Sequence, residues 1–184
     1  SNCEGNTKTI YVHWSPKAKK SFLDPTAWKT EELSAASGLG GWMYGIAMQV
    51  DNKYGIDLIA GCKDGYISWF ESPKNPRDLD SWKVHPILPT RWTMTICPSD
   101  IDEDGDIDVV VTERRGSNRG ALWLENPGNN EANSVWNHHR IGPVDAYEAM
   151  HCTIIDLDND GMEDVLNSVK GGPIKFHKRV SQSP

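Results

Sequence analysis

The chain has 184 residues and a formal net charge of −7, with eight tryptophans, three phenylalanines and 16 glycines. A chain of this length can bury the core of a domain, and its acidity argues against a general nucleic-acid surface. It holds no apolar run near the roughly 18 residues that a membrane span needs. The abundance of Gly, Asn and Asp favours short strands and tight turns over helices.

The first strand pattern is "IYVHWSP" over residues 10–16, which we interpret as the aromatic strand of a structural unit. The chain opens abruptly at Ser1, Asn2 and Cys3, so we expect it to begin partway through such a unit. We therefore assign residues 1–27 to a half unit and expect the chain to be a fragment of a larger assembly.

Three longer units follow, marked by tryptophans that recur every 54 residues, at positions 28, 82 and 136. Trp69 in "ISWFESP" and Trp123 in "ALWLENP" keep the same step. The units span 28–81, 82–135 and 136–180, and each reads as four short strands separated by turn signals. A four-stranded period slightly above 50 residues is typical of a β-propeller blade, which buries both faces of its sheet by stacking on its neighbours.

These units predict an all-β fold: a partial β-propeller over residues 1–184, with about three and a half blades of four antiparallel strands. Propellers close with about four to eight blades, so we expect a larger, seven-bladed ring. Its remaining blades would come from a segment outside this sequence or from another chain. Helix should be nearly absent, because the one weakly helical run, 30–36, falls on a strand and loop of the repeat.

Two segments of nine residues, "DIDEDGDID" at 100–108 and "DLDNDGMED" at 156–164, place carboxylates at alternate positions around one glycine. These carboxylates repel one another unless a cation lies among them, and calcium suits a carboxylate-rich, all-protein site better than magnesium. We expect two structural calcium sites. Their ligands would be the side chains at positions one, three, five and nine and the backbone carbonyl at position seven: Asp100, Asp102, Asp104, Asp106 and Asp108 in the first segment, and Asp156, Asp158, Asp160, Met162 and Asp164 in the second.

The corresponding segment of the first full unit, "QVDNKYGID" at 49–57, departs from this pattern. Tyr54 stands where the glycine belongs, and Lys53 places an ammonium group where a carboxylate should be. We therefore expect no calcium in this unit. We expect Lys53 to serve as an internal cation that bridges Asp51 and Asp57.

The acidic segments are not EF-hands, because position twelve holds Val111 or Asn167 in place of a glutamate and strand patterns flank both of them. Together with "VVVTE", "ALWLENP" and "WNHHRI", they resemble the FG-GAP/VCBS repeats of calcium-binding β-propellers, from about Thr9 to Lys178. The resemblance implies that each calcium turn joins the innermost and second strands of a blade. The expected calcium sites suggest a secreted protein in an extracellular or periplasmic setting.

Ligand contacts are expected on the loops that lead into the inner strands and on the turns that face them, at the end of the propeller away from the calcium turns. Loops on a rigid scaffold commonly carry function. Packing between blades is an equal alternative for Trp42 and Trp92, a core role is the interpretation we favour for His151, and a solvated turn position is the commoner one for Arg114. The candidates are Trp42, Tyr44, Arg91, Trp92, Arg114, Tyr147 and His151.

Two functions fit these residues. The first is a module that binds a glycan or an extracellular protein through its loop face. The second is a carbohydrate-active enzyme, such as a polysaccharide lyase or sugar dehydratase, with a Tyr/His/Arg site. Convergence of Tyr, His and Arg on one pocket would favour the enzyme. No catalytic residue can be assigned, because no Ser-His-Asp order, phosphate-binding glycine loop or zinc spacing is present.

The four cysteines, Cys3, Cys62, Cys97 and Cys152, form no C-x-x-C pair, so the sequence indicates neither a zinc site nor a thioredoxin-like motif. A secreted protein with this set could form up to two disulfides. For Cys97 and Cys152, which lie in apolar strand patterns, the interpretation we favour is buried free thiols.

Overall fold

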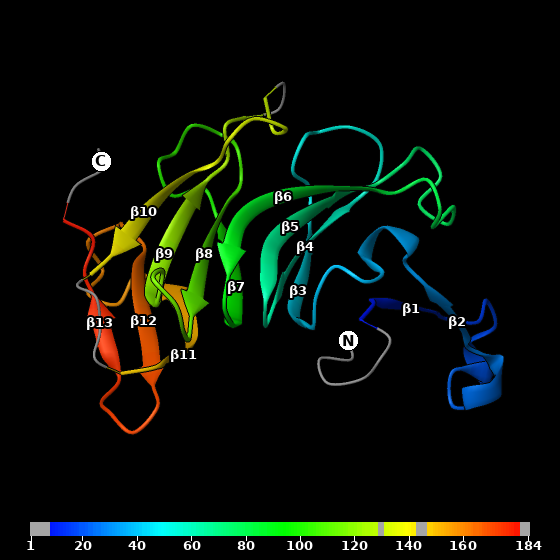
Figure 1. The fold of residues 1–184 in the computed structure, drawn as a ribbon, viewed down its shortest axis with the longest axis horizontal. Helices are drawn as coiled ribbons and strands as arrows, with labels where there is room; N and C mark the ends of the chain where they lie inside the picture. The colour runs from blue at the N-terminus through cyan, green and yellow to red at the C-terminus, as the bar shows by residue number, and fades with distance from the viewer. Residues whose placement is uncertain (1–7, 129–130, 143–146, 181–184) are drawn as a thin grey trace.

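The computed structural model describes residues 8–128, 131–142 and 147–180, which contain thirteen strands in four antiparallel sheets (Figure 1). A two-stranded sheet comes first, made of β1 (Tyr11–Trp14) and β2 (Lys29–Glu32). The next sheet holds β3 (Trp42–Met48), β4 (Asp57–Cys62), β5 (Gly65–Glu71) and β6 (Lys83–Thr90). The third holds β7 (Thr93–Ser99), β8 (Asp108–Glu113), β9 (Gly120–Glu125) and β10 (Asn137–Ile141). The last holds β11 (Ala149–Ile155), β12 (Asp164–Val169) and β13 (Lys175–His177).

Helix is limited, in the described residues, to three single turns of 3-10 helix: η1 (Lys19–Ser21), η2 (Pro25–Ala27) and η3 (Ser34–Ala36). The weakly helical run at 30–36 is divided between the end of β2 and η3. The expected all-β fold is confirmed. None of the helices in the described ranges has the length and apolarity that crossing a membrane requires.

Each sheet is a meander in which consecutive strands are hydrogen-bonded neighbours. Strand β7 packs against β3 on one side and β11 on the other, so the first strands of the three larger sheets lie side by side. The outer strands β6 and β10 each follow a repeated tryptophan and complete the sheet that the preceding inner strand began. The sheets fan out from this inner row as propeller blades do, and together they form an open arc in place of a closed ring (Figure 1).

The apolar core lies between neighbouring sheets, because successive strand residues point to opposite faces. Ile59 and Trp69 face the sheet of β7–β10, where they join a cluster with Val109, Leu122 and other buried residues. Ala60, with other residues of the same sheet, faces the opposite way and joins a second cluster that includes Leu33 and the side chains of β1. One sheet thus contributes to two cores, which explains why its strands are apolar on both faces.

The tryptophans of the 54-residue repeat have a shared structural role. The indole Nε1 of Trp28, Trp82 and Trp136 donates to a backbone carbonyl a few residues earlier in the chain, at 3.1, 3.0 and 3.0 Å respectively. The second repeated set also shares a contact. The rings of Trp69 and Trp123 stack on a histidine of the adjacent outer strand, His85 and His139 respectively, with ring centroids 4.5 and 4.4 Å apart. The sequence repeat is therefore a repeat of packing and hydrogen bonding.

Close approach of two blades depends on Gly61 in β4. A Cβ atom at this position would lie 2.5 Å from the side chain of Thr93, at the start of β7. Real Cβ atoms do not tolerate this distance, so a larger residue would push the inner ends of the two sheets apart.

We predict that Gly61→Ala lowers the free energy of unfolding by about 1–3 kcal/mol, since overpacking a close contact forces backbone shifts. Urea unfolding would measure this change. Gly45→Ala in β3 is the matched control, because its added methyl group would make contacts of 3.4–3.5 Å and should change stability little. Equal effects of the two substitutions would contradict the role given to Gly61.

Candidate functional site: acidic turns and a cationic cavity at opposite ends

Three turns of the same length connect the first and second strands of the three larger sheets. They occupy residues 49–56 between β3 and β4, 100–107 between β7 and β8, and 156–163 between β11 and β12. Because β7 lies in the inner row, these turns join an innermost strand to its neighbour, as the resemblance implied. The two acidic segments are therefore equivalent parts of neighbouring blades.

The three turns share one backbone conformation. The residue at position four has a left-handed φ in each of them, at Asn52 (54°), Glu103 (64°) and Asn159 (60°). Position six is also left-handed, with glycine in the two acidic turns, Gly105 (96°) and Gly161 (88°). In the first turn Tyr54 adopts the same hand at 50°, although its Cβ makes this conformation costly.

The aspartate at position nine explains how three different sequences keep one turn. Asp57, Asp108 and Asp164 are all buried, with at most 1% of their surface exposed. Each accepts a hydrogen bond from the backbone N–H at position two, at 3.1, 3.1 and 3.2 Å. Each also accepts one from a backbone N–H just beyond the third strand, at 2.8, 2.7 and 2.9 Å. This carboxylate therefore ties the turn to the sheet whether or not the rest of the turn is acidic.

In the turn at 100–108, carboxylate oxygens of Asp100, Asp102 and Asp108 lie within 4.8 Å of one another. Burial, and then the charge of Asp104, raise the pKa of Asp102. Burial raises the pKa of Asp108 to about 6. The Asp100 oxygen Oδ1 is buried and has no hydrogen-bond partner among the described residues. Three clustered carboxylates with an unsatisfied oxygen are what a hard cation would satisfy, so the residues present fit a metal ion.

The other expected ligands of this turn are placed differently. Asp104 lies outside the cluster, and its Oδ1 accepts a hydrogen bond from the backbone N–H of Asp106 at 2.9 Å. The carboxylate of Asp106 lies against Gly128, where an added Cβ would be 2.8 Å from it. The ligand expected from Asp106 is its backbone carbonyl, so the position of its side chain does not test that expectation.

The turn at 156–164 has a corresponding cluster of Asp156, Asp158 and Asp164 within 4.8 Å, and it also has a cation of its own. The ammonium group of Lys178, just after β13, forms a short hydrogen bond with Asp158 and an ion pair with Asp160 at 2.9 Å. These two contacts raise the pKa of Lys178 and lower that of Asp160. Lys178 thus neutralises part of the charge that a metal ion would neutralise.

The turn at 49–57 is neutralised from within. Lys53 pairs with Asp51 at 3.0 Å, and this contact raises the pKa of the lysine. The amide Nε2 of Gln49 donates to the carbonyl of Lys53 at 3.2 Å and to that of Gly55, at position seven, at 2.7 Å. Side-chain donors thus satisfy oxygens at positions that, in the acidic turns, are expected to face a metal ion. The expected bridge holds for Asp51 only, because Asp57 accepts backbone hydrogen bonds instead.

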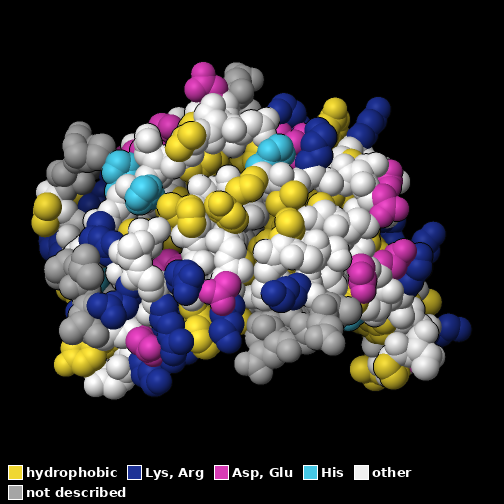
Figure 2. Space-filling view, in the orientation of Figure 1, with side chains coloured by type: hydrophobic (Ala, Val, Ile, Leu, Met, Phe, Trp, Pro, Cys, Tyr) yellow, Lys and Arg dark blue, Asp and Glu magenta, His cyan; other side chains and the backbone are white. Residues whose placement is uncertain are grey.

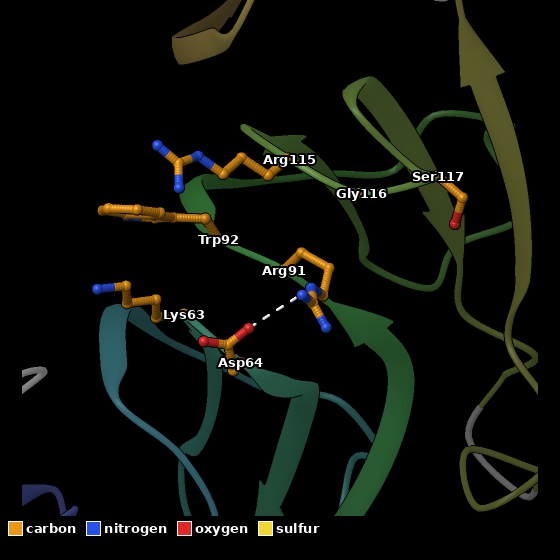
Figure 3. A pocket seen from close by; sticks show the side chains of 7 residues that line it. All are labelled: Lys63, Asp64, Arg91, Trp92, Arg115, Gly116 and Ser117. Carbon is orange, nitrogen blue, oxygen red and sulfur yellow. Dashed lines mark ion pairs between the residues drawn. The ribbon is translucent and has the colours of Figure 1, made fainter.

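At the strand ends opposite the acidic turns, a cavity of about 490 Å³ lies between the sheets of β3–β6 and β7–β10 (Figure 3). Figure 2 shows Lys and Arg side chains gathered at this end of the molecule, below β8 and β12. The turns β4–β5 and β8–β9 and the β6–β7 connection supply its walls. The lining residues are Lys63, Asp64, Arg91, Trp92, Arg115, Gly116 and Ser117.

Trp92 is at the centre of a group of cations. Lys63 Nζ and the Cζ atoms of Arg114 and Arg115 lie 4.5, 4.5 and 4.8 Å from the centroid of its ring. Lys63 and Arg115 approach the indole from opposite faces (Figure 3). Both faces are therefore occupied by cations, and the ring orients these charges through cation–π contacts, leaving no face open for a sugar to stack on.

Few carboxylates balance these cations. Glu148, in the segment before β11, pairs with Arg114 at 2.7 Å, Arg115 at 3.3 Å and Lys170 at 3.7 Å, and the Arg114 contact chiefly lowers its pKa. Arg91 lies 3.5 Å from Asp64 (Figure 3). Lys63 has no carboxylate partner within the described residues.

A buried carboxylate holds one wall of the cavity in place. Glu113, at the end of β8, has none of its surface exposed, and burial raises its pKa. It accepts hydrogen bonds from the hydroxyl groups of Thr90 and Thr93 and, at 2.9 Å, from the backbone N–H of Arg91. These bonds fix the connection that carries Arg91 and Trp92.

The other sequence-predicted ligand residues do not line this cavity. Trp42 is a core residue that donates to the carbonyl of Ala36 at 3.0 Å. Tyr44 is 38% exposed on β3, and the ring of Tyr147 lies against Gly172. His151 Nδ1 is 3.1 Å from the hydroxyl of Thr95. Sequence analysis did not find Asp64, Ser117 or Lys178, which carry no repeat signal. Part of the loop before β11, residues 143–146, lies outside the described residues.

Comparison with known proteins supports the repeat assignment. A family model described as an FG-GAP-like repeat matches residues 100–166, from the first acidic turn through the second. No curated protein and no solved structure matches the chain. The match and the stacked sheets together support an FG-GAP type of repeat in a propeller-like module.

The turn that lacks the acidic pattern offers a test of the position-nine aspartate. Burial raises the pKa of Asp57 above its usual value of 3.8, so the folded state binds this proton more tightly than the unfolded chain. Its contribution to the free energy of unfolding is therefore fully present below pH 3.8 and is lost as the pH rises through the folded-state pKa.

Asp57→Asn should lower the free energy of unfolding by about 1–3 kcal/mol at acidic pH, because it replaces the hydroxyl oxygen of the protonated carboxyl by an NH2 group that cannot accept the second backbone hydrogen bond. The difference in the free energy of unfolding between wild type and variant should become smaller toward neutral pH, as measured by urea unfolding across the pH range. Asp64→Asn, which removes an exposed charge, should have little effect. A difference that grows with pH would contradict the assigned pKa shift.

Proposed function

We propose that the protein is a secreted, calcium-stabilised β-propeller module that binds an acidic carbohydrate in the cavity beside Trp92. The observation that carries the proposal is the group of three cations held around one indole at the mouth of that cavity. Calcium would serve the scaffold at one end of the blades, and the ligand would bind at the other. An extracellular or periplasmic location suits both, since such modules use calcium at high ambient concentration.

Calcium is the metal that the acidic turns suit best. Their donor set consists of carboxylates on a turn that is closed by its own residues, which is calcium chemistry of the VCBS type. Asp100, Asp102 and Asp108 would hold the first ion and Asp156, Asp158 and Asp164 the second. The expected ligands at positions five and seven, Asp104 and Asp106 or Asp160 and Met162, would complete each set. A bound ion would neutralise the clustered carboxylates, so its role is structural.

The cavity suits an anion. It is lined by three cationic side chains and one carboxylate, a balance of two positive charges in a protein whose net charge is −7. Lys63, without a carboxylate partner among the described residues, is the cation most available to a ligand. Charge-assisted hydrogen bonds from such groups to carboxylate or sulfate are the strong ones.

The same cavity also suits hydroxyl groups, which favours a carbohydrate over an acidic peptide. The carboxylate of Asp64, whose side chain is 65% exposed, can accept hydrogen bonds from sugar hydroxyls but would repel a chain of acidic residues. Ser117 adds a hydroxyl to the lining. A volume of about 490 Å³ falls within the range of small-ligand sites.

Catalysis by a Tyr/His/Arg site receives no comparable support. Tyr44, Tyr147 and His151 do not line the cavity that holds Arg91 and Arg115. The convergence that would favour a lyase or dehydratase is therefore missing from this cavity. Binding is the function that its geometry supports best.

Removal of calcium should destabilise the protein, because the clustered carboxylates would then repel one another without compensation. We expect a chelator to lower Tm by about 5–15 °C and calcium to restore it. Asp102→Asn should reduce the calcium stoichiometry measured by calorimetric titration from two to one. Asp51→Asn, at the equivalent position of the first full unit, is the matched control and should leave two. An unchanged Tm with chelator would argue against calcium in these turns.

Ligand binding can be tested with a trimer of galacturonic acid and its methyl ester in calorimetric titrations with calcium present. We expect the free acid to bind at least about tenfold more tightly than the ester, since the ester removes the charge and keeps the hydroxyls. Lys63→Met should weaken binding of the acid about tenfold. Lys74→Met, which removes an exposed lysine at the other end of the blade, should not.

Titrations with two other anionic ligands show which kind of acidic ligand the cavity prefers. A sulfated disaccharide that binds more tightly than the uronic acid would assign the site to sulfated glycans. Equal binding of hexaglutamate would contradict the choice of a carbohydrate, and equal binding of acid and ester would contradict the anionic site. The calcium titration of the same samples shows whether the scaffold is intact in each case.

A further inference from the structure

Two thiols face each other across the boundary between neighbouring blades. Cys97 in β7 and Cys152 in β11 come from strands that lie side by side in the inner row, and their Sγ atoms are 3.8 Å apart. Cys97 Sγ is also 3.5 Å from the backbone carbonyl of Cys152. Both residues are half-buried, and both thiols are free in the structure.

Contacts on either side of the thiols hold the two strands in register. Residues 95, 97 and 99 of β7 share one face of the strand, because side chains alternate along it. Thr95 contacts His151 at 3.1 Å, and the hydroxyl of Ser99 forms a short hydrogen bond with Glu163. Cys97 lies between these two contacts, so the thiols are fixed opposite each other by the packing of the blades.

Apolar side chains also lie at this boundary: Val110 and Trp123 are buried on the face of β8 and β9 that carries Thr112. Both apolar clusters of the described residues lie on the other side of β7–β10, toward β1–β6. Polar contacts also join the last sheet to its neighbour, such as Thr112 to the carbonyl of Met150 and Arg114 to Glu148. The last sheet also carries exposed apolar side chains, including Ile155 and Phe176 at 44% each. A covalent link here would add to these contacts between the two blades.

We propose that Cys97 and Cys152 form a reversible disulfide that joins the second and third of the larger blades. The sulfurs need to approach by roughly 1.8 Å in total, which small side-chain rotations can supply. The contact between the thiols lowers the pKa of Cys97, whereas that contact and burial raise the pKa of Cys152.

The oxidant is a small disulfide, RSSR. One of the two cysteines, as its thiolate, attacks one of the RSSR sulfurs and expels RS⁻, which leaves a mixed disulfide on that cysteine. The other cysteine loses its proton and attacks the protein sulfur of the mixed disulfide, and the second RS⁻ departs. In total two protein thiols are oxidised, and RSSR is reduced to two RSH once the released protons are counted.

The test uses the full chain with Cys3→Ser, which removes the cysteine outside the described residues. The protein is incubated with oxidised glutathione, alkylated under denaturing conditions and mapped by mass spectrometry of non-reduced peptides. We expect one cross-linked peptide that joins Cys97 and Cys152 and is two hydrogens lighter than its parts. Cys62, a buried thiol in β4, is the matched control and should be recovered alkylated.

Alkylation of both Cys97 and Cys152 after oxidation, or glutathione on either, would overturn the proposal. Stability gives a second readout. Reduction of the oxidised protein should lower Tm by about 5–10 °C, because the cross-link closes a long loop. In Cys97→Ala and in Cys152→Ala, reduction should leave Tm unchanged. A disulfide whose reduction leaves Tm unchanged would refute the stabilising role.

Discussion

A buried carboxylate at the ninth position of each inner turn is the interaction on which the account depends. Asp57, Asp108 and Asp164 receive backbone hydrogen bonds from the start of the turn and from the end of the third strand. This pair of bonds fixes the turn against its sheet before any other side chain contributes. It follows that the carboxylates at positions one and three are brought together by the fold, and their repulsion must be offset by something positive.

The three turns offset that charge in different ways. Between β3 and β4, Lys53 and the amide of Gln49 supply the positive groups from within the turn. Between β7 and β8, a buried oxygen of Asp100 has no hydrogen-bond partner among the described residues. Between β11 and β12, Lys178 approaches from beyond the sheet and can leave again, because its side chain is 42% exposed. The same turn is therefore neutralised by its own lysine in the first of these blades, contains no lysine or arginine in the second, and is neutralised in the third by a lysine that a metal ion could displace. The opposite ends of these strands carry the cavity, so the proposed metal and ligand sites are separated by the length of the blades.

Sequence analysis predicted the repeating elements well, because they are encoded locally. The 54-residue step of the tryptophans and the two nine-residue acidic segments sufficed for the blades, the turns and the clusters at Asp100 and Asp156. What it missed depends on contacts between distant residues. Lys178 lies 20 residues from Asp158, Asp64 meets Arg91 across two turns, and Cys97 meets Cys152 across two blades. Trp92 was a candidate ligand residue with packing between blades as an equal alternative, and in the structure cations surround its ring. No spacing rule could have shown that both of its faces are covered.

The direct measurement of the central claim is the location of calcium in crystals grown with it, by anomalous scattering at long wavelength. The account predicts a peak within the turn at 100–108, a second within the turn at 156–164 with Lys178 turned away, and none within the turn at 49–57. A peak at Lys53, or calcium-replete crystals without a peak among the carboxylates of Asp100, Asp102 and Asp108, would contradict it.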